Sequence, residues 1–296
     1  MRVLIAGASG MIGTEVTAQL AAQGHEVLRL VRGAPSAANE YNWAPAARII
    51  DFTLMDRVDA VVNLSGASIS RLPWTPAWKR TILASRLEAT HTLTDAMRMA
   101  ASPPAVFVSG SAVGFYGDRP GQKLTETAIK GTGFLSDVVE AWESAAHLAP
   151  EKTRVVTVRT GVVVGRGGAM KPLLPAGRLG LLGPIAGGGQ HWPWVSLHDE
   201  AAAIVHLLDS TLRGPVNVAG PTLATADTVL RALAATLRRP YGLPLPAKAI
   251  TLALGDAGRE LLLASQKVVP QKLLDDGFVF SEPTVRDAME RLVAKR

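Results

Sequence analysis

Short apolar segments alternate with longer amphipathic segments along much of the 296-residue chain. Residues 3–6 are uniformly apolar and predict a buried strand, and apolar positions at helical spacing over residues 14–22 predict a helix after it. Gly24 breaks the helical pattern, and residues 26–31 predict a second strand. A strand, a glycine-rich turn, a helix and another strand in this order predict the opening βαβ unit of a parallel sheet.

The same alternation predicts further elements along the chain. Apolar runs predict strands over residues 48–52, 60–67, 105–111, 154–164 and 215–219. Helical periodicity predicts helices over residues 76–100, 132–149 and 283–296. Two segments follow neither pattern: residues 35–47 predict a loop, and residues 171–189, rich in Gly, Pro and Leu, predict a semi-ordered lobe that closes over a site.

The order of these elements predicts the fold class. We expect an α/β fold, a doubly wound parallel sheet of the NAD(P)-binding Rossmann type, with a smaller and mostly helical C-terminal lobe. The cofactor domain is expected in residues 1–165 and the substrate lobe in residues 166–296, which also supply late elements of the sheet.

Composition narrows the range of functions. The chain has no cysteine, which excludes disulfides and thiol catalysis, and its six histidines show no metal-binding spacing, so no metal is expected. The net charge of +6 comes from scattered cations and fits an anionic cofactor or substrate better than nucleic acid. No apolar stretch reaches about 18 residues, so we expect no membrane span. The first strand directly follows Met1, which predicts a cytoplasmic protein.

The turn after the first strand carries the clearest chemical signal. Gly7 and Gly10 allow a tight turn and the close approach of a pyrophosphate, and Gly13 lets the helix pack against the strand. Amide groups and the positive dipole end at the helix start would bind the pyrophosphate. A tight turn without a ligand is the alternative. The expected cofactor contacts of this turn are Gly7, Ser9, Gly10, Met11, Ile12 and Gly13.

The end of the second strand predicts which dinucleotide binds. Sites specific for NAD carry an acid there for the ribose 2′-hydroxyl, whereas an arginine nearby accommodates a 2′-phosphate. Val31 and Arg32 occupy this place, so NADP(H) is favoured over NAD(H). In the alternative interpretation, Arg32 is only a loop cation.

These residues resemble the extended short-chain dehydrogenase/reductase superfamily, whose turn is GxxGxxG, as in residues 7–13. The resemblance is closer to an NAD(P)-dependent epimerase-like branch sometimes labelled cell-division inhibitors. Its marks are residues 59–67, Trp74 with Ser85-Arg86, residues 109–117, Phe134-Leu135 before Trp142-Glu143, and residues 159–165 and 187–199. Residues 238–285 resemble the small C-terminal domain of that branch. The resemblance covers essentially the whole chain and implies the Rossmann fold.

One departure from the superfamily bears on activity. There, a tyrosine four residues before a lysine carries acid–base chemistry, but none of the three tyrosines here has a lysine four residues later. The resemblance places the pair at Phe134 and Val138. Such assistance is typically worth about 10² to 10⁴ in rate. Ser111 matches the site serine of the superfamily and would donate to a carbonyl oxygen. Tyr116 is the candidate acid, and a packed loop aromatic is the alternative.

Further candidates border the expected cleft. Arg86 would clamp a phosphate or a substrate carboxylate, or else form a surface ion pair. The cofactor contacts expected at two strand ends are Leu64, Ser65, Gly66, Thr160 and Val162. The substrate-side candidates are Lys171, Gln190, His191, Trp192 and Trp194, of which the two tryptophans are more often packing residues.

The sequence thus predicts an NADP(H)-dependent oxidoreductase or an enzyme that resembles nucleotide-sugar epimerases. Its substrate is expected to be a small polar molecule, either nucleotide-linked or not. The alternative is a non-catalytic NADP(H)-binding sensor that is read by a protein partner. The missing tyrosine and lysine favour the sensor, whereas Ser111 and the glycine-rich turn favour the enzyme. We expect neither nucleic acid nor a membrane as a partner. The sequence is compatible with a homodimer but does not determine the oligomeric state.

Overall fold

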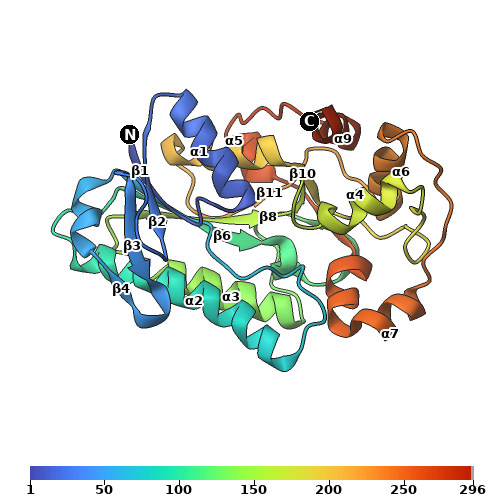
Figure 1. Cartoon of the computed structure of the whole chain (residues 1–296), viewed down its shortest axis with the longest axis horizontal. Helices are drawn as coiled ribbons and strands as arrows, with labels where there is room; N and C mark the ends of the chain where they lie inside the picture. The colour runs from blue at the N-terminus through green and yellow to red at the C-terminus, as the bar shows by residue number, and fades with distance from the viewer. Residues whose placement is uncertain (295–296) are drawn as a thin grey trace.

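The computed structural model describes residues 1–294, and an eight-stranded sheet forms its centre (Figure 1). The order across the sheet is β11-β8-β6-β5-β1-β2-β3-β4. These strands are β1 (Arg2–Ala6), β2 (Glu26–Val31), β3 (Glu40–Ala44), β4 (Ile49–Ile50), β5 (Ala60–Asn63), β6 (Val106–Ala112), β8 (Arg154–Thr160) and β11 (Gly214–Val218). All neighbours pair in parallel except β3 and β4. The strand order reverses at β1, and ligands of such sheets bind at the carboxyl ends of the strands beside this point.

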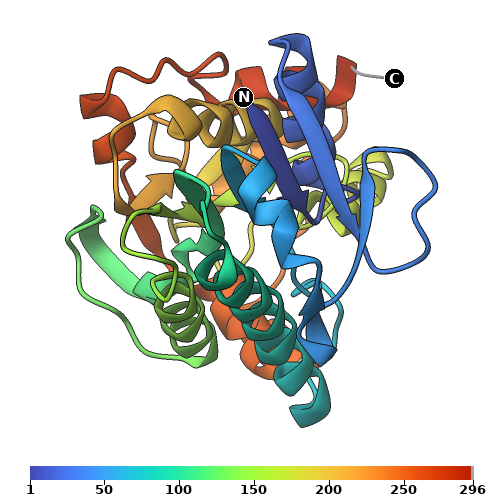
Figure 2. The same ribbon diagram turned by 90° about the vertical axis from the view of Figure 1, so that its left-hand side faces the viewer.

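Helices cover both faces of the sheet. Figure 2 shows α2 (Pro76–Met99) beside α3 (Phe134–Ala146), and α1 (Met11–Ala22) packs with α5 (Leu197–Asp209) on the opposite face. Alternate residues of β1 enter the two cores because successive strand side chains point to opposite faces. Val3 and Ile5 pack with Val16 of α1, whereas Leu4 packs with Leu93 of α2. The doubly wound fold predicted from the sequence is therefore confirmed.

The C-terminal lobe is mostly helical and lies beyond the carboxyl end of β8 (Figure 1). Its helices are α4 (Met170–Arg178), α6 (Ala226–Thr236), α7 (Ala247–Gly258), the π-turn Arg259–Leu263 and α9 (Val285–Ala294), whereas α8 (Gln271–Asp275) packs against β11 of the large sheet. Two small parallel sheets pair β9 (Val162–Val164) with β10 (Trp194–Ser196) and β7 (Arg119–Leu124) with β12 (Gln266–Val268). Short 3₁₀ turns cover Pro45–Ala47, Phe52–Arg57 and Val113–Tyr116.

Three sequence predictions need correction. The predicted loop 35–47 contains β3, an edge region in which only Trp43 is buried, so its apolar signal is weak. The predicted strand 154–164 is two strands, because the chain leaves the large sheet at Gly161. The predicted semi-ordered segment 171–189 begins inside α4, and its later part is tied to Leu245 by the Ala186 N–H at 2.9 Å.

The end of the chain agrees with the predicted helix as far as the structure reaches. Helix α9 covers Val285–Ala294, and the last two residues of the predicted helix lie outside the described residues. Within residues 1–294, no helix combines the length and the apolar character needed to cross a bilayer.

Candidate functional site

The glycine turn between β1 and α1 has the geometry that its sequence predicts. Gly7 has φ +85°, and a Cβ there would lie 2.8 Å from the Leu64 backbone. A Cβ at Gly13 would lie 2.2 Å from the Gly7 carbonyl oxygen, so helix and turn touch without a side chain between them. The Gly10 N–H donates to the Gly7 oxygen at 3.0 Å and closes the turn.

The start of α1 is open to an anion. Gly10 is its exposed N-cap, no side chain caps it, and its first turn contains no acidic residue. The unpaired amide groups and the helix dipole make such a start electropositive. Ser9 is exposed, and Met11 and Ile12 are half-buried beside it. These features suit a pyrophosphate.

The end of β2 carries an unpaired cation. Val31 is half-buried and Arg32 is exposed at the strand end, and no ion pair joins Arg32 to another residue within 1–294. Its guanidinium is therefore available to an outside anion.

Arg86 lies against the segment that follows β5. Its Nη1 donates to the Ala67 oxygen at 3.1 Å and to the Ile82 oxygen at 2.9 Å, and its guanidinium lies 5.0 Å from the Trp142 ring. A Cβ at Gly66 would lie 3.2 Å from its guanidinium carbon. Burial lowers the pKa of Arg86 to about 10. No acidic side chain in the described part of the chain pairs with it, so the surface ion pair that we considered is absent.

The remaining residues of this segment lie close to the turn. Leu64 and Ser65 are half-buried, and Gly66 is exposed. The Ser65 N–H donates to Asn63 Oδ1 at 3.1 Å, which fixes the backbone where β5 ends. Residues 64–67 thus contact the glycine turn on one side, where Leu64 lies against Gly7. On the other side they contact Arg86, which lies against Gly66.

Ser111 belongs to a buried ionic network between β6, α3 and β8. Its hydroxyl donates to Glu143 Oε1 at 2.6 Å. Arg159, only 3% exposed, holds both oxygens of that carboxylate, with Nε and Nη2 each at 2.8 Å. Ser111 and Arg159 face each other in the register of β6 and β8. Because a hydroxyl has one hydrogen, Ser111 offers only acceptor lone pairs to a ligand in this arrangement, rather than the expected donor.

The structure does not support Tyr116 as the acid. Its side chain is fully buried, and its Oη donates to Asn217 Oδ1 at 2.6 Å and accepts from Arg159 Nη1 at 3.0 Å. Burial raises the pKa of this phenol. The hydroxyl group is thus held inside the protein by its two partners, and Tyr116 acts as the packed loop aromatic that was the alternative.

Apolar packing fills the positions of the superfamily dyad. Phe134 packs edge-on against Trp74, with ring centroids 5.5 Å apart, and Val138 is buried in the same cluster. Glu260 of the C-terminal lobe caps α3 by accepting from the Phe134 and Leu135 N–H groups at 3.0 and 2.7 Å. Phe134 is half-buried, with the Lys79 ammonium group 5.0 Å from the centre of its ring, whereas Val138 lies in the apolar interior.

The loop after β8 covers a buried acid. The Thr160 hydroxyl donates to Glu200 Oε1 at 2.6 Å. Glu200 has no exposed surface, its Oε2 has no partner, and burial raises its pKa to about 8. Gly161 is required here because a Cβ would lie 2.1 Å from the Pro193 oxygen, and the half-buried Val162 donates its N–H to the same oxygen at 2.6 Å.

The predicted substrate-side residues fall into two groups. Trp192 and Trp194 are buried, and their indole N–H groups donate to the Leu262 and Thr222 carbonyls, which marks them as packing residues. The side chain of Gln190 donates to the backbone, His191 is half-buried with its pKa lowered by burial, and Lys171 is exposed.

Four charged residues at the site have no role predicted from the sequence, although the structure shows that their side chains hold its elements together. They are Glu143, Arg159, Glu200 and Glu260. One signal was available: Arg159 interrupts an apolar strand, and a buried arginine requires an anionic partner. The partner itself, 16 residues earlier on another element, has no sequence signature.

Comparison with known proteins agrees with this architecture. A family model described as the NAD dependent epimerase/dehydratase family matches residues 3–219, and a domain of unknown function, DUF1731, matches residues 245–292. Human epimerase family protein SDR39U1 is 36% identical over 299 residues, which cover 99% of this chain and 100% of that protein. An epimerase family protein of Mycobacterium bovis is 37% identical over 290 residues, which cover 97% of this chain and 96% of that protein.

Two solved structures are similar over nearly the whole chain. The crystal structure of human SDR39U1 isoform 2 with NADPH has a TM-score of 0.91 and 34% identity, with 100% of both chains covered. A nucleoside-diphosphate sugar epimerase from Corynebacterium glutamicum has a TM-score of 0.80 and 29% identity, over 99% of this chain and 58% of that one. The chain therefore belongs to the NAD dependent epimerase/dehydratase family, within the extended short-chain dehydrogenase/reductase superfamily.

Proposed function

We propose that the protein binds NADP(H) on the turn formed by residues 7–13. The turn supports this because a Cβ at Gly7 or Gly13 would collide with backbone, while the helix start beyond it is exposed and free of acids. Arg32 adds positive charge at the end of β2, and Arg86 of α2 adds it beside the segment that follows β5. The human relative that crystallised with NADPH supports the same cofactor for this chain.

We further infer an oxidoreductase or epimerase-like activity on a small polar substrate. Bound NADP(H) supplies hydride chemistry, and the acid–base chemistry has to come from this chain. Ser111 and Glu143 are the residues best arranged for this acid–base chemistry. The Ser111 hydroxyl lies 2.6 Å from Glu143 Oε1 and can pass its proton to that carboxylate.

In this proposal, Ser111 and Glu143 replace the missing dyad as a proton relay. A substrate hydroxyl would donate to Ser111 Oγ, and as it loses its proton to Oγ, the Ser111 proton would move to Glu143 Oε1. Arg159 orients the carboxylate through both of its oxygens. In the opposite direction, the same two proton transfers run in reverse and protonate a carbonyl oxygen.

The second candidate function is a non-catalytic NADP(H) sensor. The packing of Phe134 and Val138 favours it, because the chain has no tyrosine and lysine at the dyad positions. A sensor does not require the hydrogen bond between Ser111 and Glu143.

Anaerobic oxidation of protein-bound NADPH against a panel of simple carbonyl compounds and nucleotide sugars distinguishes the two functions. Turnover of any panel member, reduced about 10²-fold or more in Glu143→Gln, is the result expected for the enzyme with its relay. Tight NADPH binding without oxidation favours the sensor, and no binding contradicts the cofactor assignment.

Glu140→Gln is the matched control. Glu140 lies on the same helix, is exposed and pairs with Lys130 at 2.8 Å, so its loss removes a charge without touching Ser111. Equal loss of turnover in the two variants would contradict the relay. Ser111→Ala is a second variant, which removes the relay while leaving the Glu143 and Arg159 pair intact.

A further inference from the structure

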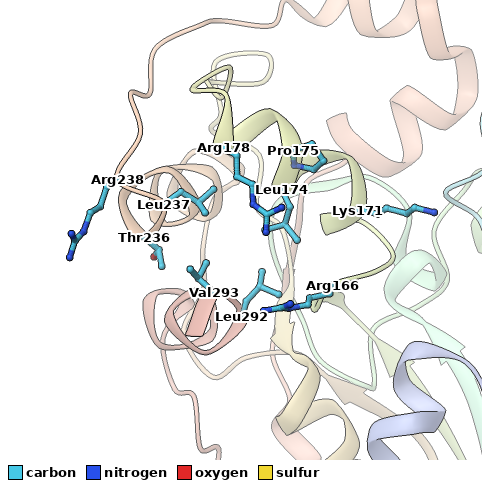
Figure 3. Close-up of a pocket in the computed structure, with 10 residues that line it drawn as sticks. All are labelled: Arg166, Lys171, Leu174, Pro175, Arg178, Thr236, Leu237, Arg238, Leu292 and Val293. Carbon is cyan, nitrogen blue, oxygen red and sulfur yellow. The ribbon is translucent and has the colours of Figure 1, made fainter. Parts of the chain in front are cut away.

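A cavity lies in the C-terminal lobe between α4, the end of α6 and α9 (Figure 3). Its volume is about 540 Å³, within the range of small-molecule sites. None of its lining residues belongs to β1, α1, β5 or β6, which carry the glycine turn and Ser111. The cavity therefore shares no lining residue with the candidate cofactor site, although it adjoins it, because Gly165 and Gly167 on either side of Arg166 lie against Met11.

The lining of this cavity combines an apolar floor with cations. Leu174, Leu237 and Leu292 form the leucine floor, and the other apolar lining residues are Pro175 and Val293. The polar lining residues are Arg166, Lys171, Arg178, Thr236 and Arg238, and no acidic residue lines the cavity.

Two of the four cations converge on the hollow. Figure 3 shows the guanidinium groups of Arg166 and Arg178 pointing into it, whereas Lys171 and Arg238 point away on opposite sides. The side chains of Arg166 and Arg178 form no hydrogen bond and no ion pair with any other residue within 1–294. Two like charges are thus directed at one space without a counter-ion from the described chain.

We propose that this cavity binds an amphipathic organic anion, an apolar ring or short chain that carries a phosphate or a carboxylate. Arginine guanidinium groups bind both kinds of oxyanion through paired N–H donors. The leucine floor would bury the apolar body of the ligand and contribute the hydrophobic part of its affinity.

Isothermal titration calorimetry with 1-naphthyl phosphate tests the proposal. We expect saturable binding at one site, at least about tenfold tighter than inorganic phosphate, since only the naphthyl probe also covers the leucine floor. 1-Naphthoate tests a carboxylate in place of the phosphate. Whichever of the two anions binds more tightly shows which charged group the cavity prefers. Naphthalenemethanol is the neutral arm, and equally tight binding of this alcohol would overturn the anion assignment.

Variants locate the probe. Arg166→Gln combined with Arg178→Gln is expected to weaken binding at least about tenfold. Arg238→Gln is the matched control, because Arg238 lines the same cavity but points away from it, and it is expected to bind like the wild type. All three arginines are exposed, so a thermal melt should show unchanged folding.

The titration is repeated with excess NADPH to exclude the cofactor site. Binding that persists and still depends on Arg166 and Arg178 supports the proposal, whether or not the protein binds NADPH. The proposal is overturned by a lack of saturation at millimolar probe, by displacement of the probe by NADPH, or by an equal loss of binding in Arg238→Gln.

Discussion

Glu200 should make the stability of the protein fall as the pH rises. Its carboxyl group has no exposed surface, accepts one hydrogen bond from Thr160, and has no cationic partner within the described chain. Burial therefore favours the neutral acid and raises its pKa from 4.5 to about 8. Glu200→Gln removes the titration and keeps a neutral side chain of similar shape.

The size of the effect follows from these two pKa values. The contribution of the protonated group is fully present below the unfolded pKa of 4.5, and it is lost as the pH rises to about 8. Each pH unit within this window costs about 1.4 kcal/mol. Between about pH 5 and pH 8, the free energy of unfolding of the wild type should fall by about 4 kcal/mol relative to that of Glu200→Gln.

Urea unfolding of both proteins at several pH values across this window measures the difference. The two curves of unfolding free energy against pH should diverge steadily and become parallel above about pH 8. Glu140→Gln serves as an exposed control and should follow the wild type. Parallel curves for the wild type and Glu200→Gln throughout the window would show that Glu200 ionises freely, which would refute the reasoning.

Three further predictions concern the candidate cofactor site and the dyad positions. Arg32→Asp should weaken NADPH binding far more than NADH binding in a fluorescence titration, and equal losses would remove its 2′-phosphate role. Gly13→Ala should lower the free energy of unfolding by about 1–3 kcal/mol and strongly weaken NADPH binding, because its Cβ would lie 2.2 Å from the Gly7 oxygen. Val138→Lys should lower the free energy of unfolding by several kcal/mol, because it places an ammonium group in a buried cluster. A Val138→Lys protein as stable as the wild type would contradict this packing account.

The cofactor half could be predicted from the sequence because its signals are local. Gly7, Gly10 and Gly13 lie within one turn, and each is explained by contacts inside or next to that turn. The strand from Glu26 to Val31 has the bounds predicted for it, since its apolar run is bordered by breaking residues.

The chemistry of the site could not be predicted in the same way because it depends on contacts between distant segments. Ser111 meets Glu143 from 32 residues away, and the Tyr116 hydroxyl meets Asn217 from 101 residues away. No periodicity in the sequence encodes such pairs. The position of Tyr116 in a loop therefore predicts an accessible acid, whereas its burial depends on contacts that only the fold shows. Arg159 was the one available clue, as a charge inside a strand that is otherwise apolar or hydroxylic after its first residue.

The binding of NADPH to the purified wild-type protein tests the central claim most directly. A fluorescence titration should show saturation at one NADPH per chain, with much weaker binding in Gly13→Ala at a temperature where both proteins are folded. Absence of saturation in the wild type, or equal affinity in Gly13→Ala, would contradict a dinucleotide site on this turn.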